Sequence, residues 1–146
     1  MDVKKQRVLV LCTGNSCRSQ MAEALFRSLA GDRFESFSAG THPTAVNPRA
    51  IRAMAEVDID ISSYRSQSVE QYVDQNFDYV ITVCDHARES CPVFPNAQQS
   101  LHWPFEDPAV APGNEDEIMS VFRKVREQIK RRIEEFVGGK IEDRVG

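Results

Sequence analysis

The sequence predicts a single α/β domain built around a parallel β-sheet. Three observations support this prediction: short continuous apolar runs typical of strands buried on both faces, helical periodicity in the segments between them, and the absence of repeats, low-complexity tracts or linkers along the 146 residues. A chain of this length makes one ordinary domain and can bury its own core without disulfide bonds. We therefore treat residues 1–146 as one domain and expect its ligand outside the carboxyl ends of the strands.

Four segments are predicted to be strands. RVLVL and YVITV are continuous apolar runs, as expected of parallel strands that are covered on both faces. FESFSA alternates in polarity and is closed by Gly40, which favours a more lateral strand, and QSLHW supplies a fourth. These strands are expected at residues 7–11, 34–39, 79–83 and 99–103.

Helical segments lie between and after these strands. Apolar residues recur at helical spacing from Ser19 until Gly31 ends the pattern. Asn47 can cap a second helix that has Pro48 in its first turn. The last helix keeps one apolar face along its length, with acidic residues at its start and basic residues near its end that suit the helix dipole. The helices are expected at residues 19–30, 47–57, 69–73 and 115–136, the last with its apolar face from Ile118 to Phe136.

Composition and charge limit the partners and the compartment. The 18 basic and 22 acidic side chains give a net charge of −4, whereas nucleic acids and anionic membranes select for basic surfaces. No apolar run reaches the ~20 residues that span a bilayer, and MDVKKQ leads into the first strand without a signal-peptide core. We therefore expect a cytoplasmic monomer whose four cysteines serve metal binding, redox or nucleophilic chemistry instead of permanent disulfides.

A polar stretch, CTGNSCRS, separates the first strand from the first helix. A strand that turns into a helix leaves backbone N–H groups directed at one point, which suits a tetrahedral oxyanion, and Arg18 adds further donors. Cys12 is expected at the mouth of this site, where these groups favour the thiolate. The residues expected to bind the oxyanion are Thr13, Gly14, Asn15, Ser16, Cys17, Arg18 and Ser19. The alternative is an ordinary turn in which Cys12 and Cys17 are small buried residues.

This stretch resembles the phosphate-binding loop of low-molecular-weight protein tyrosine phosphatases, which carry Cys-x5-Arg-Ser near the amino terminus of a chain of similar length. Ser38-Ala39-Gly40 and the pair Asp107-Pro108 match the same family. The resemblance implies a three-layer α/β fold with a central four-stranded parallel sheet, and Asp107 as the general acid that protonates the leaving oxygen. An ordinary turn-capping role for Asp107, and Glu106 as the acid, stay open.

Two further cysteines favour a reductase over a phosphatase. Cys84 follows YVITV, so in a parallel sheet it should open on the same edge as Cys12, and Cys91 comes later in a polar stretch. A thiol pair beside a nucleophilic cysteine permits a relay, in which Cys84 breaks a sulfur–arsenic bond at Cys12 and the resulting disulfide passes to Cys91. Phosphate transfer has no use for this relay, whereas the reduction of arsenate does.

The combination is similar to the thioredoxin-coupled arsenate reductases that share the phosphatase fold. They match CTGNSCRSQMAEA, the spacing of the two later cysteines with Cys-Pro at the second, and a tryptophan, here Trp103, before Asp-Pro. The resemblance implies arsenate as substrate, phosphate or sulfate as its mimics, and thioredoxin as the final reductant. The catalytic residues that it implies are Cys12, Arg18, Cys84, Cys91 and Asp107. Ser19 and Asn15 would hold the loop and the sulfur, and residues 84–95 should change shape during the relay.

Three alternative functions were weighed. A phosphatase would hydrolyse aryl phosphates through a Cys12 phosphocysteine, but Ala109-Val110-Ala111 stand where such enzymes carry aromatic residues. A non-catalytic oxyanion-binding module would not need a thiolate under its ligand. A zinc site is disfavoured because Cys-x6-Cys lacks the tight spacing of zinc knuckles. Its ligands would be Cys84, His86, Cys91 and His102.

Some related reductases hold a potassium ion near the loop through asparagine, glutamate and serine side chains and one acidic residue. Asn15, Glu23 and Ser38 match these positions, but Gln67 stands where we align the acid. Because that charge is missing, we expect no tightly held metal or cofactor. Potassium on Asn15, Glu23 and Ser38 is the alternative.

Overall fold

The four strands form one parallel sheet, in the order β2-β1-β3-β4. The structure is a computed structural model that describes residues 4–84 and 94–145, with side chains up to residue 139. The strands are β1 (Gln6–Cys12), β2 (Phe34–Gly40), β3 (Phe77–Thr82) and β4 (Ala97–His102). The predicted α/β class and the lateral position of the second strand are confirmed.

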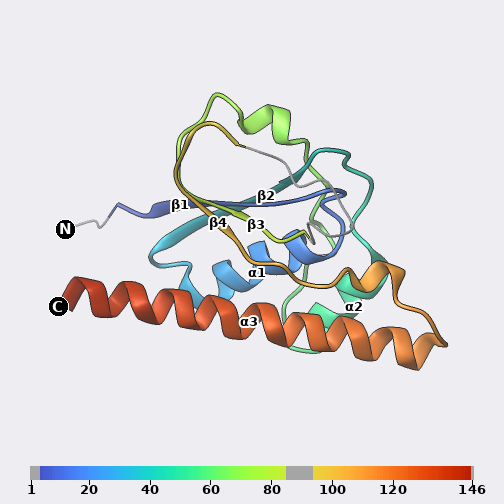
Figure 1. Ribbon diagram of the computed structural model, residues 1–146. Coiled ribbons are helices and arrows are strands. Elements are labelled where there is room, and N and C mark those ends of the chain that lie inside the picture. The colour runs from blue at the N-terminus through green and yellow to red at the C-terminus, as the bar shows by residue number, and fades with distance from the viewer. Residues whose placement is uncertain (1–3, 85–93, 146) are drawn as a thin grey trace.

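Helices cover one face of this sheet. In Figure 1, α1, α2 and α3 lie together on one side of the strands, α3 runs along the sheet, and η1 lies on the opposite side. The helices are α1 (Arg18–Ala30), α2 (Pro48–Ala55) and α3 (Glu115–Val145), and the 3-10 helices are η1 (Val69–Tyr72) and η2 (Pro108–Val110). The three-layer α/β architecture is therefore as expected.

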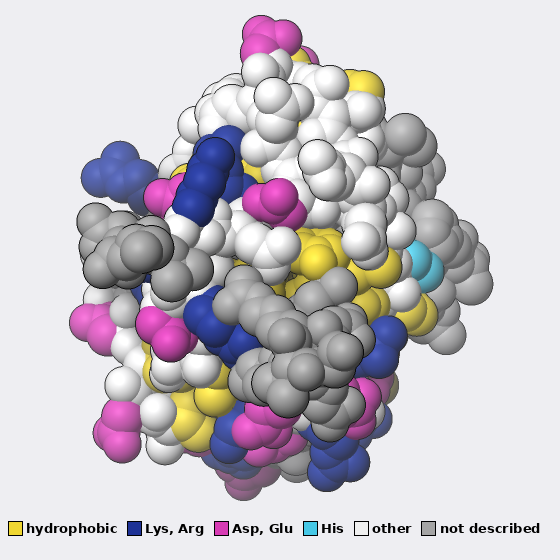
Figure 2. Space-filling view, turned by 90° about the vertical axis from the view of Figure 1, so that its left-hand side faces the viewer, with side chains coloured by type: hydrophobic (Ala, Val, Ile, Leu, Met, Phe, Trp, Pro, Cys, Tyr) yellow, Lys and Arg dark blue, Asp and Glu magenta, His cyan; other side chains and the backbone are white. Residues whose placement is uncertain are grey.

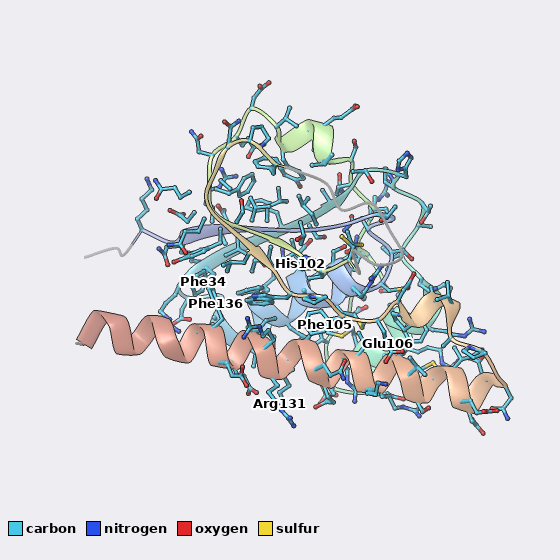
Figure 3. All side chains as sticks on the ribbon, in the orientation of Figure 1. Phe34, His102, Phe105, Glu106, Arg131 and Phe136 are labelled. Carbon is cyan, nitrogen blue, oxygen red and sulfur yellow. The ribbon has the colours of Figure 1, made fainter. Side chains whose placement is uncertain are left out.

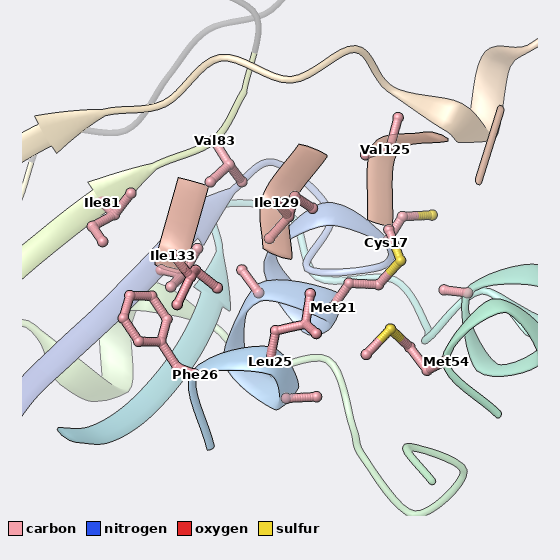
Figure 4. Close-up of a cluster of buried hydrophobic side chains, with 14 of the residues drawn as sticks. Cys17, Met21, Leu25, Phe26, Met54, Ile81, Val83, Val125, Ile129 and Ile133 are labelled. Carbon is pink, nitrogen blue, oxygen red and sulfur yellow. The ribbon is translucent and has the colours of Figure 1, made fainter. Parts of the chain in front are cut away.

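The central strand β1 joins two apolar clusters. Val8, Val10 and Cys12 belong to the cluster on the helical side, whereas Leu9 and Leu11 belong to the cluster on the other side, as the alternation of side chains along a strand requires. Cys12 therefore continues a fully buried stripe to the carboxyl edge of the sheet. Figure 4 shows part of the helical-side cluster, in which α1 and α3 contribute Cys17, Met21, Leu25, Phe26, Val125, Ile129 and Ile133.

The boundaries of two predicted strands are displaced, and a polar residue accounts for the earlier start of β3. β3 and β4 each begin two residues earlier and end one residue earlier than predicted. The polar Asp78 interrupts the apolar pattern at the start of β3, but its carboxylate accepts a hydrogen bond from Arg7 N at 2.7 Å, on the neighbouring strand. This hydrogen bond stabilises Asp78 within β3. The hydrophobic periodicity of the sequence alone would place Asp78 outside the strand.

The helix caps follow local chemistry. Asn47 Oδ1 accepts from Arg49 N at 2.8 Å, which confirms the predicted cap of α2. α3 begins before its apolar periodicity because Asn114 and Glu117 form a reciprocal capping box, with hydrogen bonds of 2.9 and 3.2 Å. The predicted short helix at residues 69–73 is the 3-10 helix η1.

Charges of both signs are interspersed on the surface. Figure 2 shows this for the face that turns away from the carboxyl ends of the strands, where Lys and Arg side chains alternate with Asp and Glu. This mixture agrees with the small net charge of −4. Among the described residues, no helix has the length and apolar character needed to cross a membrane.

Gly40, at the end of β2, is predicted to tolerate no side chain. A Cβ atom there would lie 2.4 Å from Thr13 O and 2.9 Å from Asn15 N, both of them backbone atoms. We expect Gly40→Ala to displace the loop after β1, to lower the free energy of unfolding by about 1–3 kcal/mol, and to weaken phosphate binding.

Gly138→Ala is the matched control for this substitution. Gly138 lies within α3, and a Cβ atom added there would meet no neighbouring atom within 4 Å, so alanine should stabilise the helix by about 0.5–1 kcal/mol. Urea unfolding and phosphate titration check both variants. Equal effects of the two substitutions would contradict the close approach at Gly40.

Candidate active site

The loop between β1 and α1 turns its carbonyl oxygens outward. Three of them accept backbone hydrogen bonds from the segment between β2 and α2: His42 N to Thr13 O at 2.9 Å, Thr44 N to Gly14 O at 3.1 Å and Asn47 N to Ser16 O at 3.0 Å. The fourth, Asn15 O, accepts from Ser66 Oγ at 2.7 Å. In a trans peptide the next N–H points opposite to the carbonyl, so the N–H groups of residues 14–17 are directed inward. This arrangement makes an anion-binding nest.

The first turn of α1 contributes to the same nest. Its N-cap residue, Cys17, makes no side-chain cap hydrogen bond, so the helix N-terminus is available to an anion. Arg18 is 3% exposed and lines the cavity in front of the loop. Its Nη1 donates to Phe105 O at 3.1 Å, and its Nη2 lies 3.7 Å from Asp107 Oδ2. The guanidinium is therefore fixed between the loop and the segment after β4.

A hydrogen-bonded chain connects the predicted nucleophile to the back of the loop. Cys12 Sγ lies 3.1 Å from Ser19 Oγ, and Asn15 Nδ2 donates to the same hydroxyl oxygen at 2.8 Å. Asn15 has a φ of 49°, in the left-handed region that asparagine tolerates better than most residues. Asn15 and Ser19 are fully buried, and they support the loop from behind instead of lining the cavity.

The cavity in front of the loop has a volume of about 690 Å³. Of the predicted oxyanion residues, five line it together with Cys12: Thr13, Gly14, Ser16, Cys17 and Arg18. The opposite part of its lining comes from the segment after β4: Glu106, Asp107, Ala109, Val110, Ala111 and Pro112. The cavity thus combines cysteine, backbone donors and a guanidinium with a carboxyl group and a short aliphatic wall.

The position of Asp107 is compatible with both roles that the sequence left open. Its Oδ1 caps η2 by accepting from Ala109 N at 3.0 Å, while the residue also lines the cavity beside Arg18. A carboxyl group on the wall of this cavity is in place to protonate a leaving oxygen. Glu106 lines the cavity too, but its Oε1 pairs with Lys124 Nζ of α3 at 2.5 Å. Figure 3 shows Phe105 and Glu106 in the segment between β4 and α3.

Cys17 is chemically different from Cys12 although both are free thiols that line the cavity. Burial raises the pKa of Cys17 to about 12, and the hydrogen bond with Ser16 Oγ offsets only part of this increase. Cys17 is therefore a neutral thiol at physiological pH, which leaves Cys12 as the nucleophile of the loop.

The structure brings the third predicted cysteine to the same edge of the sheet. Leu11 pairs with Thr82 in the parallel register, and Val83 N donates to Leu11 O at 3.0 Å, so Cys12 lies one residue and Cys84 two residues beyond paired positions of neighbouring strands. Neighbouring strands lie about 4.8 Å apart, within the Cα separation that a disulfide spans. Cys84 is fully buried and disulfide-bonded, whereas Cys12 is free. Cys91 and most of the segment predicted to change shape lie outside the described residues.

Three residues support the loop in a way that the sequence did not predict, since Gln67 was considered only for its position near the potassium ligands. Gln20 Nε2, Ser66 Oγ and Gln67 N all bind Asn15. Gln20 occurs within the CTGNSCRSQMAEA motif, but Ser66 and Gln67 lie some fifty residues away in the sequence. Nothing in their local pattern distinguishes them from ordinary surface residues of a loop.

The side chains considered for potassium are hydrogen-bonded or ion-paired within the chain. Asn15 Oδ1 already accepts from Gln67 N at 2.8 Å and from Gln20 Nε2 at 2.9 Å. Glu23 binds Ser38 Oγ at 2.6 Å and the guanidinium of Arg27 at 3.0 Å, so a positive charge already neighbours its carboxylate. The oxygens of Asn15 and Glu23 are thus engaged by donors of the chain itself, and Ser38 is one of those donors.

The structure describes two of the four residues that were considered as zinc ligands, Cys84 and His102. The sulfur of Cys84 is part of a disulfide and is not available as a thiolate ligand in this state. His86 and Cys91, two of the other ligands considered, lie outside the described residues. His102, the last of them, places Nδ1 2.8 Å from Thr82 Oγ1.

Comparisons with known proteins agree with the fold and the anion-binding loop described above. The family model "Low molecular weight phosphotyrosine protein phosphatase" matches residues 7–145. An arsenate reductase of Halalkalibacterium halodurans is 45% identical over 134 residues, 92% of this chain and 96% of the relative. The structure of an arsenate reductase in its phosphate-binding state superimposes with a TM-score of 0.78 at 34% identity, covering 92% and 98% of the two chains.

A second solved structure that resembles this chain is a thioredoxin-dependent arsenate reductase from Corynebacterium glutamicum. It superimposes with a TM-score of 0.66 at 27% identity. The match covers 92% of this chain and 63% of that one.

Alkylation should distinguish the two cysteines of the loop. Cys12 and Cys17 are 3% and 4% exposed, so a difference in their rates reports chemistry and not access. At pH 7 we expect iodoacetamide to modify Cys12 at least tenfold faster than Cys17, because the thiolate is the reactive form. Phosphate should slow the reaction at Cys12. Peptide mass spectrometry measures both rates, and equal labelling would contradict the assignment of the nucleophile.

Potassium should have no specific effect on this protein. We expect the melting temperature and the affinity for phosphate to be the same in KCl, NaCl and choline chloride at equal ionic strength. Arg27→Gln removes the guanidinium beside Glu23, so any potassium dependence should arise only in this variant. Arg33→Gln, which removes a half-buried guanidinium that lies over the Phe34 ring, is the control. Stabilisation of the unmodified protein by potassium alone would show that the site does accept the ion.

Proposed function

The chain belongs to the low molecular weight phosphotyrosine protein phosphatase family, and we propose that it works as an arsenate reductase of that family. Its substrate is arsenate, which phosphate and sulfate mimic, and its product is arsenite. A relay through Cys12, Cys84 and Cys91 supplies the two electrons, and thioredoxin restores the thiols. We place this chemistry in the cytoplasm, where thioredoxin keeps thiols reduced.

The observation that carries the proposal is the pairing of β1 with β3. This pairing puts a buried, oxidisable cysteine, Cys84, at the strand end beside the free Cys12 of the anion-binding loop. A phosphatase needs the loop, Arg18 and Asp107, but it has no use for a second cysteine at this position. The 45% identity to an arsenate reductase supports the same conclusion.

The first step joins sulfur to arsenic. The inward N–H groups of residues 14–17 and Arg18 hold the arsenate oxygens, and the Cys12 thiolate attacks the arsenic atom. A sulfur–arsenic bond forms, an arsenic–oxygen bond breaks, and Asp107 donates the proton with which the departing oxygen leaves as water. Arsenic stays in the +5 state, so no electrons have yet been transferred to it.

The second step reduces arsenic. The Cys84 thiolate attacks Cys12 Sγ, a Cys12–Cys84 disulfide forms, and the electron pair of the sulfur–arsenic bond stays on arsenic. Arsenic leaves in the +3 state as arsenite, and two thiols have been oxidised to one disulfide. The electrons therefore balance without an external oxidant or reductant.

The third step restores the nucleophile. The Cys91 thiolate attacks Cys84, which releases Cys12 as a thiolate, and the dithiol of thioredoxin then reduces the remaining disulfide. A disulfide at Cys84 beside a free Cys12 matches the state that precedes this reduction.

Hydrolysis of aryl phosphates is the competing reaction. The loop binds phosphate by the same groups, so slow turnover through a Cys12 phosphocysteine is expected. The wall after Asp107 is aliphatic, however, and Val110 is 69% exposed. It offers no aromatic face on which the ring of a phosphotyrosine would stack.

Parallel assays rank the two activities. We expect arsenate turnover that requires thioredoxin and thioredoxin reductase, and aryl phosphate hydrolysis at least a hundredfold lower in kcat/KM. Efficient hydrolysis without thioredoxin-dependent arsenate turnover would assign the protein to the phosphatases instead.

Replacement of Cys91 should stop the relay once the Cys12–Cys84 disulfide has formed. In Cys91→Ser, one equivalent of arsenate should release one equivalent of arsenite and leave a Cys12–Cys84 disulfide, because no thiol remains to release Cys12. Non-reducing peptide mass spectrometry identifies the linked pair. Cys17→Ser is the control and should turn over repeatedly. Sustained turnover by Cys91→Ser, with no trapped disulfide, would remove Cys91 from the mechanism.

A further inference from the structure

Gln20 is a buried amide at the back of the active-site loop. It is 1% exposed, on the first turn of α1, and does not line the cavity in front of the loop. Its Nε2 lies 3.1 Å from Asn15 O, 2.9 Å from Asn15 Oδ1 and 3.1 Å from Arg65 O. One side-chain amino group therefore joins the loop to the segment around residue 65.

At Asn15, the hydrogen bonds behind Cys12 have a fixed direction. Gln67 N is a backbone amide and can only donate, so the Asn15 atom 2.8 Å from it must be the carbonyl oxygen Oδ1. The amino group of Asn15 then faces Ser19 and donates to its hydroxyl oxygen at 2.8 Å. The Ser19 hydroxyl proton is left to point at Cys12 Sγ, 3.1 Å away.

This direction matters for the nucleophile. A hydroxyl that donates to sulfur stabilises its anionic form, whereas a hydroxyl that accepts from sulfur stabilises the thiol. The polarity of the chain from residue 67 to residue 12 thus decides whether Ser19 assists or opposes the attack of Cys12.

We propose that Gln20 is a positioning residue that sets this polarity and so keeps Cys12 nucleophilic. Its Nε2 is a second donor to Asn15 Oδ1, which holds the Asn15 amide in the required orientation. The hydrogen bond from Gln20 Nε2 to Arg65 O also holds the neighbouring segment in place, and Gln67 N of that segment donates to Asn15 Oδ1. The inference rests on the proposed function only in taking Cys12 as the attacking group, and it applies to any reaction that Cys12 initiates.

Gln20→Glu tests the proposal because it changes a donor into a titratable group of nearly the same shape. The introduced carboxylate would face three acceptor oxygens, so burial and these acceptors raise its pKa above the ordinary value of about 4.3. Below that pKa the protonated carboxyl can still donate one hydrogen bond, and above it the carboxylate repels Asn15 Oδ1.

The readout is the rate of Cys12 alkylation by iodoacetamide between pH 5 and pH 8, measured by peptide mass spectrometry. For Gln20→Glu we expect the rate relative to the unmodified protein to fall at least tenfold as the pH rises across this range. For Gln20→Met, which removes the donor without adding a charge, we expect a reduction of about three- to tenfold at pH 5 that does not grow as the pH rises.

Gln71→Glu is the matched control. Gln71 is exposed, and its Nε2 binds Gln67 Oε1 at 2.6 Å, so this variant adds the same charge near the same segment without touching Asn15. Its alkylation profile should follow that of the unmodified protein. Circular dichroism and thermal melting establish that each variant is folded.

Two results would overturn the proposal. One is a relative alkylation rate in Gln20→Glu that is independent of pH while the protein stays folded. The other, decisive even if Gln20→Glu is unstable, is unchanged alkylation of Cys12 in Gln20→Met. Alkylation needs no arsenate, so a protein that fails to reduce arsenate but shows the expected profiles would contradict the proposed function and leave this inference intact.

Discussion

The active site depends on one constraint: the peptide groups of residues 13–17 must all face the same way. Each carbonyl oxygen of residues 13–16 is engaged on the outer side of the loop, by a backbone N–H of the neighbouring segment or by Ser66 Oγ. The N–H groups are consequently turned toward the cavity, together with the N-terminus of α1 and Arg18. Gly40 belongs to this constraint, because only a residue without Cβ lets β2 approach the loop so closely.

A second constraint turns an anion site into a candidate redox site. The parallel pairing of β1 with β3 sets the distance between Cys12 and the start of the cysteine pair, and burial keeps the adjacent Cys17 a neutral thiol. One edge of the sheet therefore carries the proposed nucleophile Cys12, the spectator thiol Cys17 and the proposed relay residue Cys84. The difference between the spectator and the other two comes from the environment and not from the residue type.

The sequence predicts much of this because several signals are local. RVLVL and YVITV are apolar enough to identify the central strands, and Cys-x5-Arg-Ser between strand and helix identifies the loop. The predicted start of β3 was wrong because the polar Asp78 accepts a hydrogen bond from the neighbouring strand. The support from Ser66 and Gln67 could not be predicted, because those contacts join segments about fifty residues apart. The engagement of Glu23 by Arg27, which argues against potassium, likewise depends on side-chain geometry that spacing alone does not determine.

The most direct test of the account is a proton–nitrogen NMR titration of Cys12→Ser protein with arsenate, in which the anion binds but cannot react. If the inward peptide groups hold the substrate, the amide resonances of Gly14, Asn15, Ser16 and Cys17 should shift together, with one shared dissociation constant. Shifts that spare these four amides and occur only at exposed basic residues would contradict the account, because arsenate would then bind somewhere other than above Cys12.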